Sequence, residues 1–400
     1  MTQPLGLNPA RGDGLRLLLA VLIVSLNLRG AITCVGPLLK QIQDTFALSS
    51  AAAGLLSSLP LFAFAIISPY AAPLARRIGM EYAIMLSLLL LLTGLGIRYF
   101  STPLSLYGGT ALIGTGIAIS NVLLPGLLRR EFPQQLPMVT ALFTMVLVTV
   151  GGLGSGIAIP LATLGGWDFS LVFWVLPAVL GLLAWLPRLR HNTRQSKPDS
   201  AVRINLWKSG LAWQVSLFMA CQSTAFYVMI AWLPSMLADL EGISAAQSGW
   251  ILFIYQIFVL LSVMAIPLLV HRLPDQRWIG ASCALLILLA YCGITWSTAN
   301  ALWWMILMGL GAGGSLVLAM TLFSLRVSSA MQTVALSGMA QAVGYTMAAL
   351  VPILVGFIYD LTHSWQIPLL LMIGICALQT VTGYLAGRPL VVEPEVATSA

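Results

Sequence analysis

The chain has 400 residues, of which 59% are hydrophobic and only 8% charged, and its mean hydropathy is +0.95. Soluble domains average about 45–50% apolar and about 25% charged residues, so this composition excludes a soluble, disordered or fibrous protein and indicates a polytopic membrane protein. The five cysteines lie within apolar runs without C-x-x-C spacing. No metal site, cofactor site or disulfide framework is therefore expected.

Twelve apolar runs are long enough to cross a bilayer, because a membrane-spanning helix needs about 20 mostly apolar residues. The first follows Arg11 and Arg16 and is too long for a cleaved signal peptide. In chain order the runs cover 15–36, 51–74, 82–99, 104–128, 138–164, 169–187, 211–233, 248–270, 278–297, 301–325, 331–358 and 365–386. Every backbone polar group must be paired within lipid, so we expect an all-α integral membrane protein with twelve transmembrane helices.

The positions of the basic residues predict the orientation. If both termini are cytoplasmic, sixteen of the nineteen Lys and Arg residues fall on the cytoplasmic side. The outer side keeps only Lys40 and Arg98, and Arg29 falls within a span. This distribution obeys the positive-inside rule, so the net charge of +7 is explained by a lipid bilayer and no nucleic-acid partner is expected.

An internal repeat divides the spans into two sets of six. A G-x-G sequence at Gly114 stands fifteen residues before Arg129, and another at Gly311 stands fifteen residues before Arg326, an offset of 197. Pro37 and Pro234 have the same offset, and Ser49 and Ser244 are 195 apart. We therefore predict six-helix bundles at 1–190 and 208–400, joined by a cytoplasmic linker at 191–207 and related by a parallel pseudo-twofold axis along the membrane normal. In transporters of this organisation, the binding site lies between the halves.

Arg29 is the most informative residue within a span, because an arginine at a helix centre costs about 2.5–3.5 kcal/mol to insert. One interpretation is that it faces a cavity and binds substrate. The other is that it extends to the outer surface or bonds to a neighbouring helix. Thr33 lies one turn further along the same face. Asn27 lies about 200° away on the helical wheel, so it is expected to orient the helix or a neighbour.

Other polar side chains are candidates for the opposite walls of the cavity. Small polar residues in spans commonly serve helix packing, whereas an amide has more hydrogen-bonding groups to satisfy. All twelve acids are expected in loops or tails, so no proton relay is predicted and Arg29 suits an anionic or strongly polar substrate. The predicted substrate-binding set is Arg29, Asn27, Thr33, Asn121, Tyr227, Gln256, Gln341 and Tyr345.

Three segments resemble the cyanate and 2-nitroimidazole transporter family of the major facilitator superfamily: NLRGAITCVGPLL (27–39), SNVLLPGLLRREFP (120–133) and ALSGMAQAVGY (335–345). Gly30 stands where that family often has proline, and APLARRIGME (72–81) keeps little of the superfamily's basic loop signature. The resemblance implies alternating access, often for export, in a bacterial inner membrane. It also implies a cavity lined by spans 1, 2, 4, 5, 7, 8, 10 and 11.

We therefore predict a monomeric secondary transporter for a small cyanate-like or nitroimidazole-like compound. A broad drug–proton antiporter is the alternative, but Val150–Pro160 lacks the G-P-x-x-G-G ending expected of that class. A non-transporting membrane receptor is a remote alternative. The chain is not expected to be an enzyme, since its three histidines, His191, His271 and His363, lie in separate loops.

Overall fold

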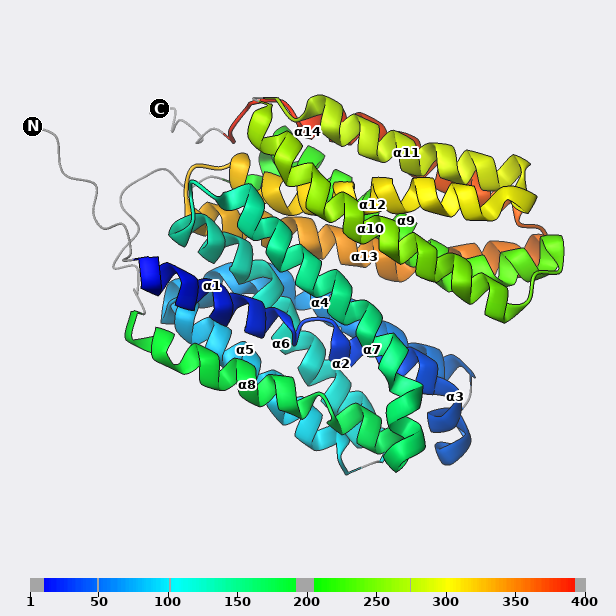
Figure 1. Cartoon of the computed structure of the whole chain (residues 1–400), viewed down its shortest axis with the longest axis horizontal. Coiled ribbons are helices and arrows are strands. Elements are labelled where there is room, and N and C mark those ends of the chain that lie inside the picture. The colour runs from blue at the N-terminus through cyan, green and yellow to red at the C-terminus, as the bar shows by residue number, and fades with distance from the viewer. Residues whose placement is uncertain (1–10, 49, 101, 192–204, 274, 393–400) are drawn as a thin grey trace, which may run out of the picture.

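The computed structural model describes residues 11–48, 50–100, 102–191, 205–273 and 275–392, and this part of the chain is helical without a strand (Figure 1). The first half contains α1 (Arg11–Ser25), α2 (Gly30–Thr33), α3 (Val35–Phe46), α4 (Ser50–Ile78), α5 (Met80–Arg98), α6 (Pro103–Glu131), α7 (Leu136–Val172) and α8 (Val175–Trp185). The second half contains α9 (Gly210–Glu241), α10 (Ala245–Arg272), α11 (Arg277–Trp296), α12 (Ala301–Leu325), α13 (Ala330–Thr362) and α14 (Gln366–Ala386).

Eleven segments of the described chain are long and apolar enough to cross a membrane. One of them, 136–191, has 56 residues, roughly 84 Å at 1.5 Å per residue, and so contains two of the predicted spans. The predicted all-α membrane fold is therefore confirmed. Residues 192–204, most of the predicted linker, lie outside the described residues, and the domain boundaries stay predictions.

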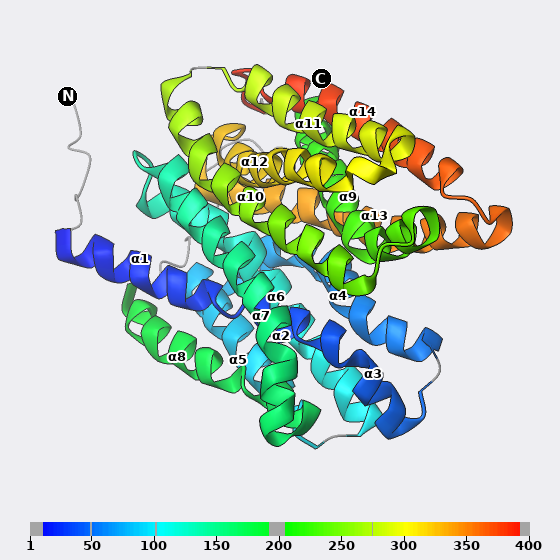
Figure 2. The same cartoon turned by 45° about the vertical axis from the view of Figure 1, so that its right-hand side comes forward.

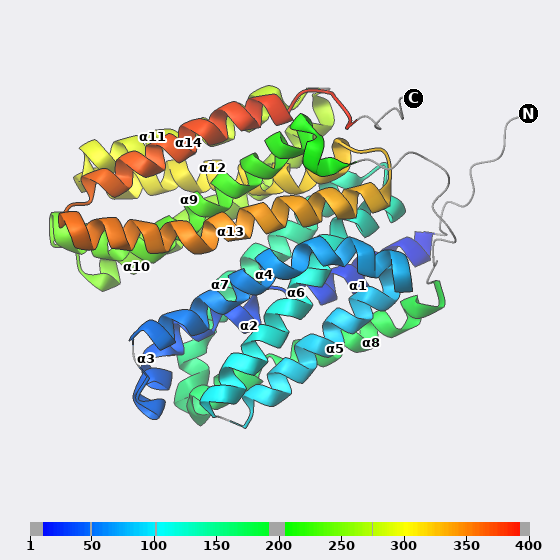
Figure 3. The ribbon, with the colours of Figure 1, turned by 180° about the vertical axis from the view of Figure 1, so that it is seen from behind.

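The helices form two side-by-side groups, α1–α8 and α9–α14 (Figures 1 and 3). Each group has its own apolar interior, because a helix in such an assembly buries one face against its neighbours. Phe143 and Trp185 are fully buried in the first group, and Phe218, Tyr291 and Phe323 in the second. We call the end of the molecule where α1 begins and α6 ends the basic end, since it carries Arg76, Arg77, Arg129 and Arg130.

The first predicted span is not one continuous helix. It ends as α1 at Ser25, passes through a turn at Leu26–Arg29, and resumes as α2 and α3, continuing to Phe46 (Figure 2). Arg29 has φ −137° and ψ −44°, which is outside the helical region. The sequence pattern missed this break because the apolar residues continue through it without interruption.

The expectation that every acid lies in a loop or tail is wrong for Glu81. This residue lies in the first turn of α5, is fully buried, and forms an ion pair with Arg130 at the end of α6. The Trp185 indole donates a hydrogen bond to the Glu81 backbone carbonyl at 3.0 Å. A buried carboxylate is tolerated at the basic end because a neighbouring guanidinium compensates its charge.

Candidate functional site

A cavity of about 780 Å³ lies between the two groups of helices. The span broken at Arg29, α4 and α7 form one wall, and α9, α10 and α12 form the other. Most of the lining is apolar, and the polar side chains are few, as in most small-molecule sites. They are Arg29, Thr33, Ser57, Ser155, Gln222, Ser223, Tyr227, Tyr255 and Gln256.

The exposure of the lining residues shows that the cavity opens away from the basic end. On α9, Met219 and Gln222 are 1% and 3% exposed, whereas Ile230, further from the basic end, is 40% exposed. On α10, Phe253 near the opposite end is 56% exposed, whereas Val259 is 3% exposed. The structure therefore has an open mouth at the end opposite the basic end and a closed floor.

The floor is closed by α13 packing against α4 and α6. A Cβ on Gly126 would lie 2.9 Å from the Ala330 carbonyl oxygen, so only glycine permits this approach of α6 to α13. The Gln341 amide on α13 donates to the Asn121 carbonyl on α6 at 3.1 Å. These contacts join the two groups of helices beneath the cavity. They must separate if the cavity is to open at the basic end.

Arg29 reaches the cavity from the break in the first span. Its side chain is partly buried, and Nη1 donates to the Tyr227 hydroxyl on α9 at 3.3 Å. Among the lining residues that the structure describes, Arg29 alone is charged. A planar guanidinium in a mostly apolar chamber presents a fork of donors suited to carboxylate, nitro or other oxygen-rich groups.

Thr33 and Ser155 organise the backbone beside Arg29. Pro37 has no N–H, so it cannot donate to the Thr33 carbonyl four residues earlier. The Ser155 hydroxyl on α7 donates to that carbonyl at 3.2 Å, and the Thr33 hydroxyl donates to the Arg29 carbonyl at 3.2 Å. The Ser155 bond fastens the resumed part of the first span to α7, and the Thr33 bond joins that part to the Arg29 backbone.

Four of the predicted site residues, Arg29, Thr33, Tyr227 and Gln256, line the cavity, and the other four do not. Asn27 donates to the Pro177 carbonyl of α8 at 3.0 Å and to the Ile23 carbonyl at 3.2 Å. Tyr345 is 2% exposed and packs edge-on against Phe64 with ring centroids 4.7 Å apart. Asn121 and Gln341 bond in the floor, because spans 4 and 11, which were expected to line the cavity, pack against each other there.

Gln222, Ser223 and Tyr255 line the cavity but are absent from the predicted set. The Ser223 hydroxyl donates to the Gln222 side-chain oxygen at 3.3 Å. The Tyr255 hydroxyl is buried and has no hydrogen-bond partner among the described residues. A buried unpaired polar group costs about 1–3 kcal/mol, so a polar ligand atom at Tyr255 would be stabilised. Gln222 and Tyr255 lie within predicted spans, but nothing in the sequence indicates which face of the helix meets the cavity.

A cavity between two helical groups in a membrane-spanning chain, closed at one end and open at the other, defines a carrier. The Major Facilitator Superfamily model matches residues 18–349, and the chain belongs to this superfamily of transporters. The predicted family resemblance is thereby confirmed.

Two bacterial relatives of this chain have a named substrate. This chain is 40% identical over 375 residues to the 2-nitroimidazole transporter of Escherichia coli (strain K12), and the match covers 93% of this chain and 95% of the relative. It is 27% identical over 369 residues to the cyanate transport protein CynX of the same organism, covering 90% and 95%. An uncharacterized transporter of Bacillus subtilis (strain 168), YycB, is 40% identical over 376 residues, covering 93% of each chain.

Solved structures share the fold at low sequence identity. The proton:xylose symporter XylE superposes with a TM-score of 0.79 at 13% identity, over 96% of this chain and 98% of that one. The transporter FucP in its outward conformation superposes with a TM-score of 0.74 at 15% identity, over 93% and 99%.

Proposed function

We propose that this protein is a secondary transporter that moves a small polar or anionic compound, cyanate-like or nitroimidazole-like, by alternating access. The observation that carries the proposal is Arg29, which is the one charged side chain among the described residues that line the cavity and lies at a break in the first span. The names of the two relatives supply the substrate class. Both compounds offer electron-rich oxygen or nitrogen atoms to a guanidinium, which suits its fixed donors.

The proposed setting is a bacterial inner membrane, with the protein acting as a monomer and in the export direction. The positive-inside rule puts the basic end in the cytoplasm, and both termini with it. The open mouth then faces outward, as in a carrier that has released its substrate outside. The floor formed by Gly126, Asn121, Gln341 and Ala330 is the part that must open on the cytoplasmic side.

Flux of radiolabelled cyanate and 2-nitroimidazole through proteoliposomes tests the proposal. We expect saturable flux of at least one compound and its loss in the Arg29→Ala variant. Movement of bulky apolar drugs with a strict proton requirement would favour the broad drug–proton antiporter instead. Saturable binding without flux in either direction would favour a non-transporting receptor.

A further inference from the structure

A second arginine, Arg98 at the end of α5, is buried deep in the first group of helices. Its side chain is 1% exposed, and no acidic residue pairs with it in the part of the chain that the structure describes. The α5 and α6 backbones approach closely here, since a Cβ on Gly109 of α6 would lie 2.6 Å from the Gly94 carbonyl oxygen of α5. An unpaired buried guanidinium needs neutral acceptors for its N–H groups, and these fix where it can sit.

The acceptors of Arg98 belong to two different elements. Nε and Nη2 donate to the Thr110 hydroxyl on α6 at 3.1 and 2.7 Å, and that hydroxyl donates to the Leu106 carbonyl at 2.6 Å. Nη1 donates to the Ala31 carbonyl at 2.8 Å. Ala31 lies in α2, the single helical turn that directly follows Arg29. Arg98 thus ties the broken segment of the first span to the closely packed pair α5 and α6.

We propose that Arg98 is a positioning residue that holds the break in the first span and thereby keeps Arg29 at the cavity. A carbonyl at a helix interruption lacks its partner within the helix, and in a membrane it must find another donor. A guanidinium supplies a stronger, charge-assisted bond than a neutral group. The anchor at Thr110 leaves the Arg98 head little freedom, so the Ala31 backbone is fixed relative to α6. The expected effect of Arg98 on substrate binding rests on the proposed function of Arg29. Its expected effect on the backbone of the first span does not.

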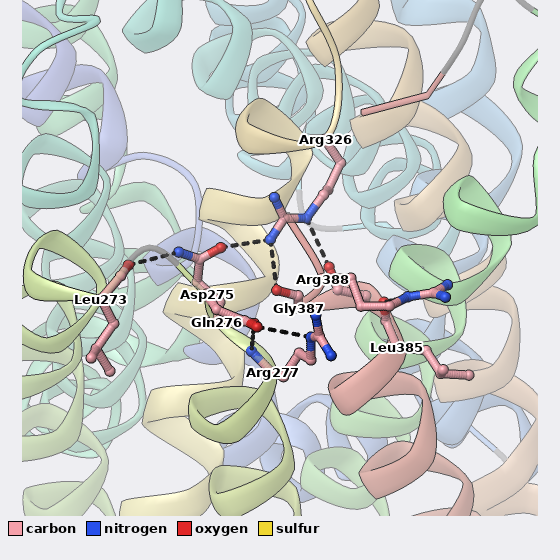
Figure 4. Close-up of polar contacts among 9 residues, drawn as sticks. Leu273, Asp275, Gln276, Arg277, Arg326, Leu385, Gly387 and Arg388 are labelled. Carbon is pink, nitrogen blue, oxygen red and sulfur yellow. Dashed lines mark hydrogen bonds and ion pairs between the residues drawn. The ribbon is translucent and has the colours of Figure 1, made fainter. Parts of the chain in front are cut away.

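Arg326 provides a matched control in the second half (Figure 4). It is also buried, 4% exposed, and donates to the Ala386 and Gly387 carbonyls at 2.8 and 3.1 Å and to the Gln276 side chain at 2.6 Å. Burial lowers the pKa of Arg326 to about 10, so its guanidinium stays charged at neutral pH. Arg326 lies at the basic end and does not line the cavity. Replacing it removes a comparable set of bonds without touching the first span.

Hydrogen–deuterium exchange of residues 26–36 in detergent tests the backbone part of the proposal. Arg98→Met removes the donors and keeps an apolar stem, and we expect it to accelerate exchange there by about tenfold, the effect of losing one charged hydrogen bond. Arg326→Met should leave these amides at the wild-type rate. Unchanged exchange in Arg98→Met, or equal acceleration by both variants, would overturn the proposal. If Arg98→Met does not fold, Thr110→Val tests the same point, because it removes only the hydroxyl that anchors Arg98. We expect Thr110→Val to accelerate exchange of residues 26–36, and an unchanged rate would overturn the proposal.

Binding of 2-nitroimidazole and of potassium cyanate separates positioning from general stability. Arg98→Met should weaken binding of the transported probe about tenfold when Arg29 is present, and have no further effect in the Arg29→Ala background. Arg98→Lys, which keeps the charge but not the fork, should restore only part of the affinity. Equal losses in both backgrounds would overturn the link to Arg29. If Arg29→Ala binds both probes normally while Arg98→Met still accelerates exchange, the proposed function fails and the positioning role of Arg98 stands.

Discussion

The first membrane span and helix α9 occupy matching places in the two repeats predicted from the sequence, yet their backbones differ. Pro37 and Pro234 are 197 residues apart, as are Arg29 and Phe226. The first span is interrupted at Leu26–Arg29, whereas α9 runs unbroken from Gly210 to Glu241 with Pro234 inside it. Proline is therefore not what breaks the first span at Arg29.

The difference lies in what surrounds each helix. At this level the α9 backbone accepts a neutral side-chain bond, from the Tyr291 hydroxyl to the Ala225 carbonyl at 2.8 Å, and α9 stays helical. In the first span, the Ala31 carbonyl accepts a bond from the charged Arg98, Asn27 donates a bond to the Pro177 carbonyl of α8, and the Trp174 ring lies against Gly30. A single neutral hydrogen bond leaves the α9 backbone helical, whereas several tertiary partners, one of them charged, surround the break in the first span.

The largest expected effect is that of Arg29→Ala on substrate binding. A hydrogen bond to a charged group contributes about 1.5–3 kcal/mol, so affinity should fall about tenfold to more than a hundredfold. Equilibrium binding of 2-nitroimidazole or cyanate to purified protein measures this. Arg29→Lys should rescue only in part because an ammonium lacks the planar fork. Wild-type affinity in Arg29→Ala would mean that Arg29 is only a structural residue and that the amide and tyrosine positions bind the substrate.

Gly30→Ala should destabilise the broken span. A Cβ there would overlap the Trp174 ring, within 2.5 Å of Cε3, and overpacking costs about 1–3 kcal/mol. Thermal unfolding in detergent should show a lower Tm than that of the wild type. Trp174→Leu combined with Gly30→Ala should recover part of the loss. Tyr227 is the residue on α9 that is 197 positions after Gly30. Tyr227→Ala creates space instead of a clash, so adding Trp174→Leu should not raise the Tm of that variant.

Tyr227→Phe should have a smaller effect than Arg29→Ala. It removes the acceptor 3.3 Å from Arg29 Nη1 and leaves the ring in place, a loss of about 0.5–1.5 kcal/mol or two- to tenfold in affinity. Titration of the same probe measures this change. A loss equal to that of Arg29→Ala would show that α9, and not the first span, supplies the main substrate contact.

An imposed pH gradient should have the smallest effect, for a neutral probe. In the described part of the chain, neither half contributes an acid or histidine to the cavity lining, and the buried Glu81 lies at the basic end, paired with Arg130. Proteoliposome flux of 2-nitroimidazole with and without the gradient should therefore be the same. A strict gradient requirement that disappears in Glu81→Gln would show that this pair, and not the cavity, couples transport to protons.

Composition and the lengths of the apolar runs alone determined that this is an all-α membrane protein, where the central part of each span lies, and that Arg29 is out of place in lipid. These follow from the physics of the bilayer, which acts on each span separately. Tertiary structure decided the break at Arg29, the burial of Arg98, and which polar side chains meet the cavity. Gln341 and Gln256 look alike in sequence, yet one bonds Asn121 in the floor and the other lines the chamber. The rotation of each helix about its axis depends on the helices packed around it. In lipid a helix is apolar on every side, so its sequence does not indicate which side faces the cavity.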